Sequence, residues 1–477
     1  MKNENKPDYE FDAYLKADNQ SPILCNVALW LPKDADENVR IEIDSPEINM
    51  TENFMGKYVS IVSEIYEENP RFVATISKAR IRQIEGQAER RKFSRIRITL
   101  LHAWDLSISE LIRSHDVEDN LVTAVYFQLS NHIYAEPKAD RCPSYIGSRK
   151  AEIERSYEVE SPTDHIFKIE KHFSAYSNLS QNKEVVSSQN VISVTSKNKI
   201  NVAEIDELVK QTDDFALLLT FAARHQVMVL GYEYRTKSKN VRYFRDPLNR
   251  YQCQDDEVVK DALIPIEYFE LFMNGALKKW HSLDEKVILA IKDVIYAIHP
   301  FHNSHQSFLD MFSAFEGVVN LFNSEVRTEL DTNWLGLKQG LNAFIDSQEF
   351  TETTKEFLKH DINGIRNREK FRSKTEYCLK DLNIVVSDLW PIFEGNSDGN
   401  SLYGIRNRLA HGSRMELDSV YLIAQEQLQF LLERLILVLL DFDYNKSAAG
   451  LTIYGIRFRY SKQEISDFQN QLKGNAS

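Results

Sequence analysis

The spacing of apolar residues changes character about halfway along the chain. Before about residue 264, most apolar runs alternate with polar residues, as in Val39–Ile43 and Val122–Leu129, and this period of two indicates half-buried strands. Val202–Ala223 has helical spacing instead, and a strand is expected behind it over Val227–Tyr232. This part therefore predicts a mixed, strand-rich domain. Its other strand-like runs are Ile23–Leu31, Tyr58–Val62, Phe72–Ile76, Lys150–Val159, His165–Phe173 and Asn190–Val194.

One predicted strand pair carries a row of cations. Lys78, Arg80 and Arg82 occupy alternate positions, and Arg95 and Arg97 alternate with apolar residues in the same way. Alternate residues of a strand share a face, so we expect a hairpin or strand pair with one basic face. That face is either a surface for nucleic acid or another ligand, or the ordinary solvated side of a half-buried sheet.

The second half of the chain has a helical period. Phe308, Phe312 and Phe315 recur at intervals of four and three residues, which places them on one face of a helix. Ser282 and Glu285 have the spacing of a capping box at the start of the preceding helix. A bundle of about four to six helices is the expected packing. Further helical segments are Trp334–Phe344, Phe357–Ile365, Tyr377–Phe393 and Leu417–Phe442.

These patterns together predict an α+β protein of two domains. Hydrophobic cores stop growing at about 250–300 residues, so a chain of 477 residues is expected to hold more than one. We place a strand-rich N-terminal domain at residues 1–263, with a sensing or regulatory role, and an all-α helical domain at 264–477. The alternating tail Leu451–Tyr460 is expected to form a short strand at the end of the second domain.

Charge and hydropathy restrict the environment and the partners. The net charge of −13 repels polyanions, so contact with nucleic acid must use a local group of cations. No apolar run reaches the roughly 18 residues of a membrane-spanning helix. The N-terminus Met1–Lys6 is polar and lacks the apolar core of a signal peptide. We therefore expect a cytoplasmic protein without a membrane partner.

The possible metal ligands do not form a clear site. The four cysteines lie far apart without a Cys-x-x-Cys pair, so we expect buried, reduced thiols. His299, His302 and His305 are three residues apart, and with Asp310 they form either a zinc site or a polar entrance to a helix. We expect no metal and no cofactor. The cysteines are Cys25, Cys142, Cys253 and Cys378.

The residues with the clearest chemistry lie between Gly404 and Gly412. Asn407 and His411 are four apart and share a helix face, Arg406 lies about 100° round from Asn407, and Gly412 is placed to end the helix. An imidazole can exchange a proton with a ribose hydroxyl or a leaving oxygen, and a guanidinium can hold a phosphate bidentately. These groups suit RNA cleavage without a metal. The alternative is a solvated arginine with a helix-terminal histidine that interacts with carbonyls.

The Arg406-to-His411 spacing resembles the Arg-x4-6-His signature of HEPN-domain ribonucleases. The Asn after the Arg, the Ala-His-Gly ending, the polar loop Gly395–Asn400 and the long apolar helix afterwards are similar to the Apea-like branch of that superfamily. The resemblance covers about Asp284–Tyr444. The order of strands and one helix in the first half looks like the N-terminal domain of ApeA-type anti-phage proteins.

This resemblance implies a metal-independent endoribonuclease that acts in abortive infection. Two copies of the motif would meet in a homodimer to form one cleft for RNA, and a phage-derived signal would be the trigger. By position, Arg406 and His411 are expected to be catalytic and Asn407 to orient or polarise. Glu316 on the aromatic helix is either a supporting group for the motif or a salt-bridged surface carboxylate.

Other interpretations remain open at this point. Arg366, Asn367 and Arg368 repeat the start of the motif, but Phe371 stands where the histidine would be, so we interpret them as surface residues. The helical domain could also be a non-catalytic HEPN adaptor that dimerises or binds a nucleotide. The strand-rich half could instead be the main functional part, as a carbohydrate or ligand sensor.

Overall fold

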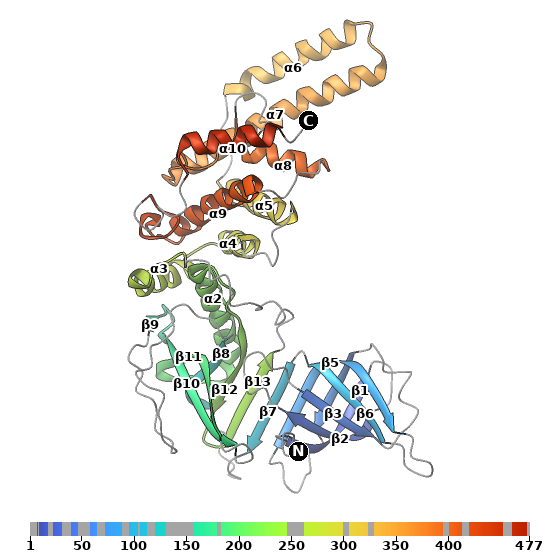
Figure 1. Cartoon of the computed structure of the whole chain (residues 1–477), viewed down its shortest axis with the longest axis vertical. Helices are drawn as coiled ribbons and strands as arrows, with labels where there is room; N and C mark the ends of the chain where they lie inside the picture. Colours follow the sequence, from blue (N-terminus) through green and yellow to red (C-terminus); the bar gives the residue numbers. More distant parts are fainter. Residues whose placement is uncertain are drawn as a thin grey trace. The chain divides into compact units, whose positions relative to one another are not determined.

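The computed structural model shows an α+β protein with strands in the N-terminal half and helices in the C-terminal half (Figure 1). The chain divides into two compact units, residues 1–262 with 266–278, and residues 263–265 with 279–477. The chain first passes between these units at residues 262–263, next to the predicted boundary, but residues 266–278 belong to the first unit again. The structure describes residues 7, 9–17, 22–30, 40–45, 58–63, 72–87, 95–103, 105–111, 120–129, 157–178, 183–245, 262–298, 305–322, 329–394, 400–412, 419–451 and 460–474.

The first unit is built on one sheet. Its described strands form a sheet of thirteen in the order β4-β1-β2-β3-β6-β5-β7-β13-β12-β8-β11-β10-β9, and every described pairing is antiparallel. The strands are β1 Tyr9–Ala17, β2 Ile23–Trp30, β3 Arg40–Ser45, β4 Tyr58–Ser63, β5 Phe72–Gln87, β6 Arg95–Ala103, β7 Asp105–Leu111, β8 Leu121–Leu129, β9 Tyr157–Glu160, β10 His165–Asn178, β11 Lys183–Asn201, β12 Val229–Arg235 and β13 Lys239–Arg245.

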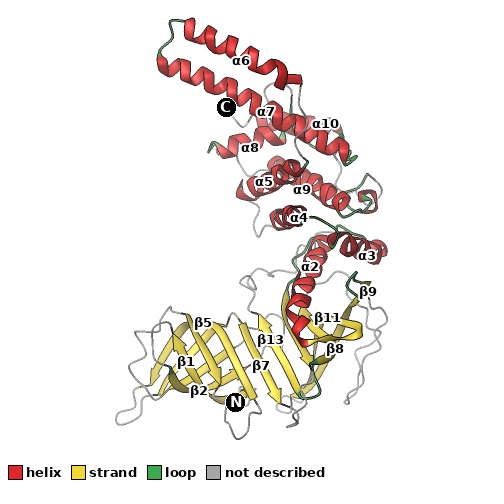
Figure 2. Ribbon diagram, turned by 180° about the vertical axis from the view of Figure 1, so that it is seen from behind, coloured by secondary structure: helices red, strands yellow, loops and turns green. Residues whose placement is uncertain are grey.

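Helix α2, Ile205–Ala223, covers one face of the sheet near β8, β11 and β12 (Figure 2). A short 3-10 turn over Val202–Glu204 leads into it, which confirms the helix predicted over Val202–Ala223. Phe215 of α2 stacks on Phe167 of β10 with ring centroids 5.0 Å apart. Burial of such apolar side chains between helix and sheet is what stabilises a two-layer unit.

The predicted pair of basic strands is present as a backbone pairing. β5 and β6 run antiparallel and are in register from Ala79 opposite Ala103 to Gln87 opposite Arg95. Their side chains lie outside the described residues, so the predicted basic face stays a prediction. The same applies to the start of the strand predicted over Lys150–Val159, of which Tyr157–Val159 is seen in β9.

The second unit contains helices only in the part that the structure describes, apart from turns and loops. Phe308, Phe312 and Phe315 of α5 are buried, which confirms the predicted aromatic face. Helix α6 runs antiparallel to α7 as a hairpin (Figure 2). The helices are α4 Glu285–Ile298, α5 His305–Leu321, α6 Glu329–Ser347, α7 Glu352–Asp381, α8 Leu402–Ala410, α9 Ser419–Leu439 and α10 Lys462–Gly474; α3 Phe269–Trp280 lies mostly in the first unit.

Two local predictions for this unit are wrong. Tyr377–Phe393 is not one helix, because α7 continues to Asp381 and then ends with Asn383 in a left-handed conformation at φ 52°. Ser282 does not cap α4 either. Its hydroxyl donates to the carbonyl of Lys279, and the Asp284 carboxylate instead accepts from the backbone N–H of Lys286.

The C-terminal segment also differs from the prediction. Residues 452–459 of the predicted strand lie outside the described residues, and the chain after them forms the unpredicted helix α10. A capping box begins this helix. The Ser461 N–H donates to the Glu464 carboxylate at 2.7 Å, and the Glu464 N–H donates to the Ser461 hydroxyl at 3.2 Å.

The described cysteines are buried free thiols, as predicted for Cys25 and Cys378. Burial raises the pKa of each thiol to about 12. Across the described ranges no group of three or more His, Cys, Asp or Glu side chains could hold a metal ion; two of the residues considered for a zinc site, His299 and His302, lie outside those ranges. None of the described helices is long and apolar enough to cross a membrane.

Candidate active site at the end of helix α8

The predicted motif lies on α8, a short helix with a firmly held N-terminus. The Ser401 hydroxyl caps the helix by accepting from the Gly404 N–H at 3.1 Å. The two N–H groups before it, those of Leu402 and Tyr403, donate at 2.9 and 3.0 Å to the carbonyls of Pro391 and Ile392. The donors that every helix start leaves open are therefore paired with a neighbouring segment.

The segment before α8 is held in turn by side chains. The Trp390 indole N–H donates to the Asn400 carbonyl at 2.7 Å, and the Asn400 amide donates to the Gln469 carbonyl of α10. Trp390 and Asn400 are buried. Unpaired polar groups in such a site would lose free energy, so these bonds fix the position of the chain just before α8.

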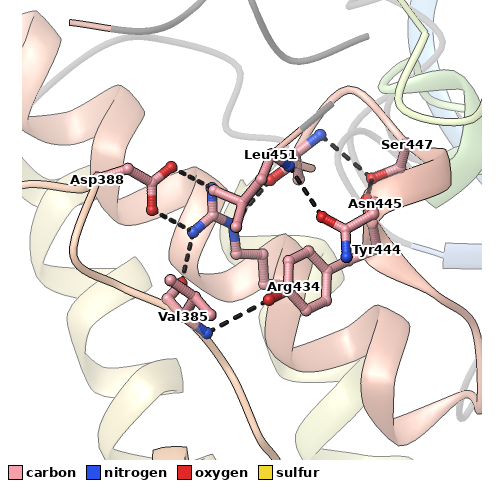
Figure 3. A network of polar contacts seen from close by, with 8 residues as sticks. Val385, Asp388, Arg434, Tyr444, Asn445, Ser447 and Leu451 are labelled. Carbon is pink, nitrogen blue, oxygen red and sulfur yellow. Dashed lines mark hydrogen bonds and ion pairs between the residues drawn. The ribbon is translucent and has the colours of Figure 1, made fainter. Parts of the chain in front are cut away.

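A buried arginine from α9 ties down the same segment (Figure 3). Arg434 is 2% exposed, and its guanidinium makes a bidentate pair with Asp388 at 2.7 and 2.8 Å. It also donates to the carbonyls of Val385 at 2.6 Å and Ala449 at 2.7 Å, and it lies 5.5 Å from the centre of the Tyr444 ring.

These contacts explain why Arg434 can be buried. A buried charge is tolerated when its donors are paired, and here a carboxylate and two carbonyls pair them. The consequence for α8 is indirect but specific. Asp388 lies three residues before Pro391, whose carbonyl accepts from the first N–H of the helix, so α9 positions the start of α8 through this segment.

One face of α8 is packed against the rest of the helical unit, whereas the C-terminal end of the helix is exposed to solvent. Leu402, Ile405 and Leu409 are buried. Tyr403 packs against the aromatic core, with ring centroids 6.1 Å from Phe312 of α5. By contrast, the last residues of the helix and its cap, from residue 410 to residue 412, are exposed. The functional side chains thus follow a rigid start and reach an accessible end.

Arg406 is held by two neighbours. Its guanidinium lies 3.3 Å from one Glu316 carboxylate oxygen and donates to the other at 3.4 Å. It also donates to the Asn407 side-chain oxygen at 3.2 Å. The Arg406 and Glu316 side chains are 32% and 28% exposed, so the pair is reachable from solvent. The sequence allowed two interpretations of Glu316, a supporting group for the motif or a salt-bridged surface carboxylate. In the structure it contacts Arg406 of the motif.

His411 is exposed at the C-terminal cap. The backbone N–H of His411 donates to the Asn407 carbonyl at 3.0 Å, and the backbone N–H of Gly412 donates to the Leu409 carbonyl at 3.0 Å. Gly412 has a φ of +78°, which confirms that it ends the helix in the left-handed conformation glycine favours. The His411 side chain is exposed, and no hydrogen bond or ion pair joins its imidazole to another described residue.

The three predicted residues do not all meet within one chain. Asn407 and His411 are about 40° apart around the helix, so they share a face as expected. Arg406 and His411 are about 140° apart at five residues' spacing, and among the described contacts none joins their side chains. One chain therefore presents a guanidinium and an imidazole on different sides of the same helix end.

The second Arg-Asn-Arg sequence lies in a different setting. Arg366 and Arg368 fall in the middle of the 30-residue helix α7. Phe371, which matches the position of His411, packs against Phe315, Phe393 and other rings of the aromatic core. It offers no group for proton transfer. The side chains of residues 363–370 lie outside the described residues.

Sequence reasoning missed the Arg434 support. An arginine inside the apolar run of α9 was a visible signal, because a charged residue on a buried helix is stable only with partners. Its partners on other segments were not readable from the sequence. In comparisons with known proteins, no family model, no curated protein and no solved structure matches this chain.

Proposed function

We propose that the chain is a metal-independent endoribonuclease of the HEPN type. The observation that carries the proposal is the end of α8, where Arg406 is oriented by Glu316 and Asn407 while His411 stands exposed five residues later. An oriented cation and an exposed imidazole on one short, firmly held helix are what cleavage of a phosphodiester by proton transfer needs.

In the proposed reaction, the ribose 2′-oxygen attacks the adjacent phosphorus. An imidazole of His411 accepts the 2′-hydroxyl proton, the bond from phosphorus to the 2′-oxygen forms, and the bond to the 5′-oxygen breaks. The leaving 5′-oxygen takes a proton from a second imidazolium. The products are a 2′,3′-cyclic phosphate and a 5′-hydroxyl. Arg406 stabilises the negative charge that builds on the phosphate oxygens in the transition state.

The reaction requires a second copy of the chain. One imidazole cannot be base and acid for the same strand break at once, and Arg406 lies about 140° from His411 around α8. A homodimer that brings two α8 ends together supplies two imidazoles and two guanidiniums to one cleft. The Asn407 side chain, between the two groups, holds Arg406 in place through its oxygen.

The strand-rich unit is proposed to restrain or trigger the nuclease. Its large antiparallel sheet, with helix α2 on one face, belongs to a different compact unit from the α8 motif. We propose that it senses a phage-derived signal in the cytoplasm and that cleavage of RNA then stops the growth of the infected cell. Deletion of residues 1–263 distinguishes restraint from activation: a constitutively active remainder means restraint, and an inert one means activation or substrate delivery.

The proposal is tested by RNA cleavage in the presence of EDTA. The full-length wild type is expected to cut RNA, while His411→Ala and Arg406→Ala are expected to lose cleavage by about 10²–10⁴-fold. Arg366→Ala is the matched control, because it removes the equivalent arginine of the α7 sequence. Activity that survives both α8 substitutions contradicts the assigned site. A folded, dimeric wild type that never cleaves RNA favours the adaptor function instead.

A further inference from the structure

A second arginine of α8, Arg408, is half-buried, and part of its guanidinium is removed from solvent. Its Nε and Nη2 atoms are shielded from solvent, and neither meets a hydrogen-bond acceptor in the described part of the chain. Five guanidinium N–H groups normally find acceptors when they are removed from water, because the loss of hydration is otherwise uncompensated. Arg408 therefore has unused hydrogen-bond donors for which the described part of the chain supplies no acceptor.

The other arginines of this region show the contrast. Arg406 is paired with Glu316, and Arg434 is paired with Asp388. Among the described residues no carboxylate pairs with Arg408, and burial lowers the pKa of its guanidinium. A partly desolvated cation without a counterion destabilises the free protein. An anion bound to the Arg408 guanidinium would compensate this cost.

Arg408 also lies on nearly the same side of α8 as His411. It precedes His411 by three residues, which places the two side chains about 60° apart around α8, whereas Arg406 is about 140° from His411. The exposed imidazole and the unpaired guanidinium therefore border the same side of the helix end. Within one subunit, the cation nearest in angle to the proposed proton-transfer group is Arg408.

We propose that Arg408 binds a phosphate group of the RNA strand beside His411 and so positions the strand for cleavage. This inference rests on the proposed function. Arg408 is a binding and positioning residue, and Arg406 keeps the role at the reacting phosphate. The guanidinium of Arg408 donates to the non-bridging oxygens, and the free energy of that contact offsets the unfavourable partial burial of the guanidinium.

The first experiment measures binding of a 20-nucleotide RNA to the full-length His411→Ala protein, in which the strand stays intact, at several salt concentrations. Arg408→Gln is expected to weaken binding about tenfold, the effect of one charge-assisted contact. It should also reduce the slope of log affinity against log salt by about 0.7, the value for one phosphate on a single strand. Arg408→Lys should keep the slope, and Arg368→Gln is the matched control on α7.

A second measurement separates binding from a structural role. Replacement of a structural arginine lowers the melting temperature, whereas Arg408→Met is expected to raise that of the RNA-free protein because it removes an unpaired buried charge. An unchanged salt slope with Arg408→Gln overturns the proposal. So does dissociation of the dimer at an unchanged slope, which would mean that a carboxylate of the second copy is the partner.

The two proposals fail in different ways. RNA binding that depends on Arg408 together with a wild type that never cleaves supports the phosphate contact and contradicts the nuclease. Cleavage that depends on His411, with the same affinity and salt slope in Arg408→Gln, supports the nuclease and contradicts the contact. A protein that binds no RNA at all contradicts both.

Discussion

The chain contains the same five residues twice, Gly-Ile-Arg-Asn-Arg at 364–368 and at 404–408. The first copy lies within the long helix α7, and three residues after it comes Phe371, which packs in the aromatic core. The second lies near the end of the nine-residue helix α8, and three residues after it comes the exposed His411. The pentapeptide alone therefore does not make a candidate site. The second copy is a candidate because it lies near an exposed helix end and is followed, three residues later, by a histidine.

The supports of the two copies differ as well. The start of α8 is bonded to Pro391 and Ile392, and the segment that carries them is tied to α9 by Arg434 and Asp388. The α7 copy has helix on both sides and needs no such anchor. A short helix is unstable by itself, so its position depends on tertiary contacts in a way that a long helix does not.

The largest effect is expected from Asp388→Asn. This change removes the negative charge that pairs with the buried guanidinium of Arg434. Breaking such a buried ion pair destabilises a protein by about 3 kcal/mol. Denaturant unfolding should show the loss, and hydrogen exchange should rise at the N–H groups of Leu402 and Tyr403 more than in the middle of α7. Equal exchange in both helices would contradict the role of Asp388 as an anchor of α8.

Arg406→Lys separates the two copies by activity. Lysine keeps the charge but cannot make the bidentate contact, so kcat for RNA cleavage should fall by about 10²-fold. Arg366→Lys, the same change in the α7 copy, should leave kcat within twofold of wild type. A similar loss in both variants would mean that the two copies are equivalent and that the helix end does not matter.

Phe371→His completes the motif in α7. We expect no new activity in a His411→Ala background, because the added imidazole would replace a ring of the aromatic core. The substitution should instead destabilise the protein by about 2 kcal/mol through lost apolar contact. Thermal unfolding and RNA cleavage of the double variant measure the two effects. Restored cleavage would show that an exposed helix end is unnecessary.

Glu316→Gln tests the orientation of Arg406. The amide keeps the size of the side chain and removes its charge, so the guanidinium loses a partner at 3.3 Å. We expect kcat to fall about tenfold while the free energy of unfolding changes by less than about 1 kcal/mol, since the pair is partly exposed. A rise in kcat would instead mean that Glu316 masks Arg406 in the resting protein.

The smallest effect concerns Cys378 at the end of α7. Burial raises the pKa of this thiol from 9.0 to about 12, so the unfolded chain ionises first as the pH rises. Stability should be unaffected below about pH 9 and should decrease as the pH rises from there toward 12. Alkylation of Cys378 in the native protein should be slow at pH 8 and should report opening of α7 alone. Rapid alkylation without unfolding would contradict its burial.

The local sequence pattern predicted the helices of the site better than it predicted the contacts between them. The aromatic face of α5 and the end of α8 at Gly412 follow from residue spacing and from the conformational freedom of glycine, which are properties of adjacent residues. Contacts over long distances in sequence were not predictable in this way. The bond from Leu402 to Pro391 and the pairing of Arg434 with Asp388 depend on how separate segments pack. Helix α10 is an exception: it was not predicted, although its capping box of Ser461 and Glu464 is a local signal.

The central claim is tested most directly by the chemistry of the cleaved ends. An RNA oligonucleotide incubated with the full-length wild type in EDTA should yield 2′,3′-cyclic phosphate and 5′-hydroxyl ends, and His411→Ala should yield none. A matched oligonucleotide with a 2′-deoxyribose at the cleaved position should remain intact at that position. Cleavage of the deoxy-substituted position, or cleavage by His411→Ala at the wild-type rate, would contradict the account.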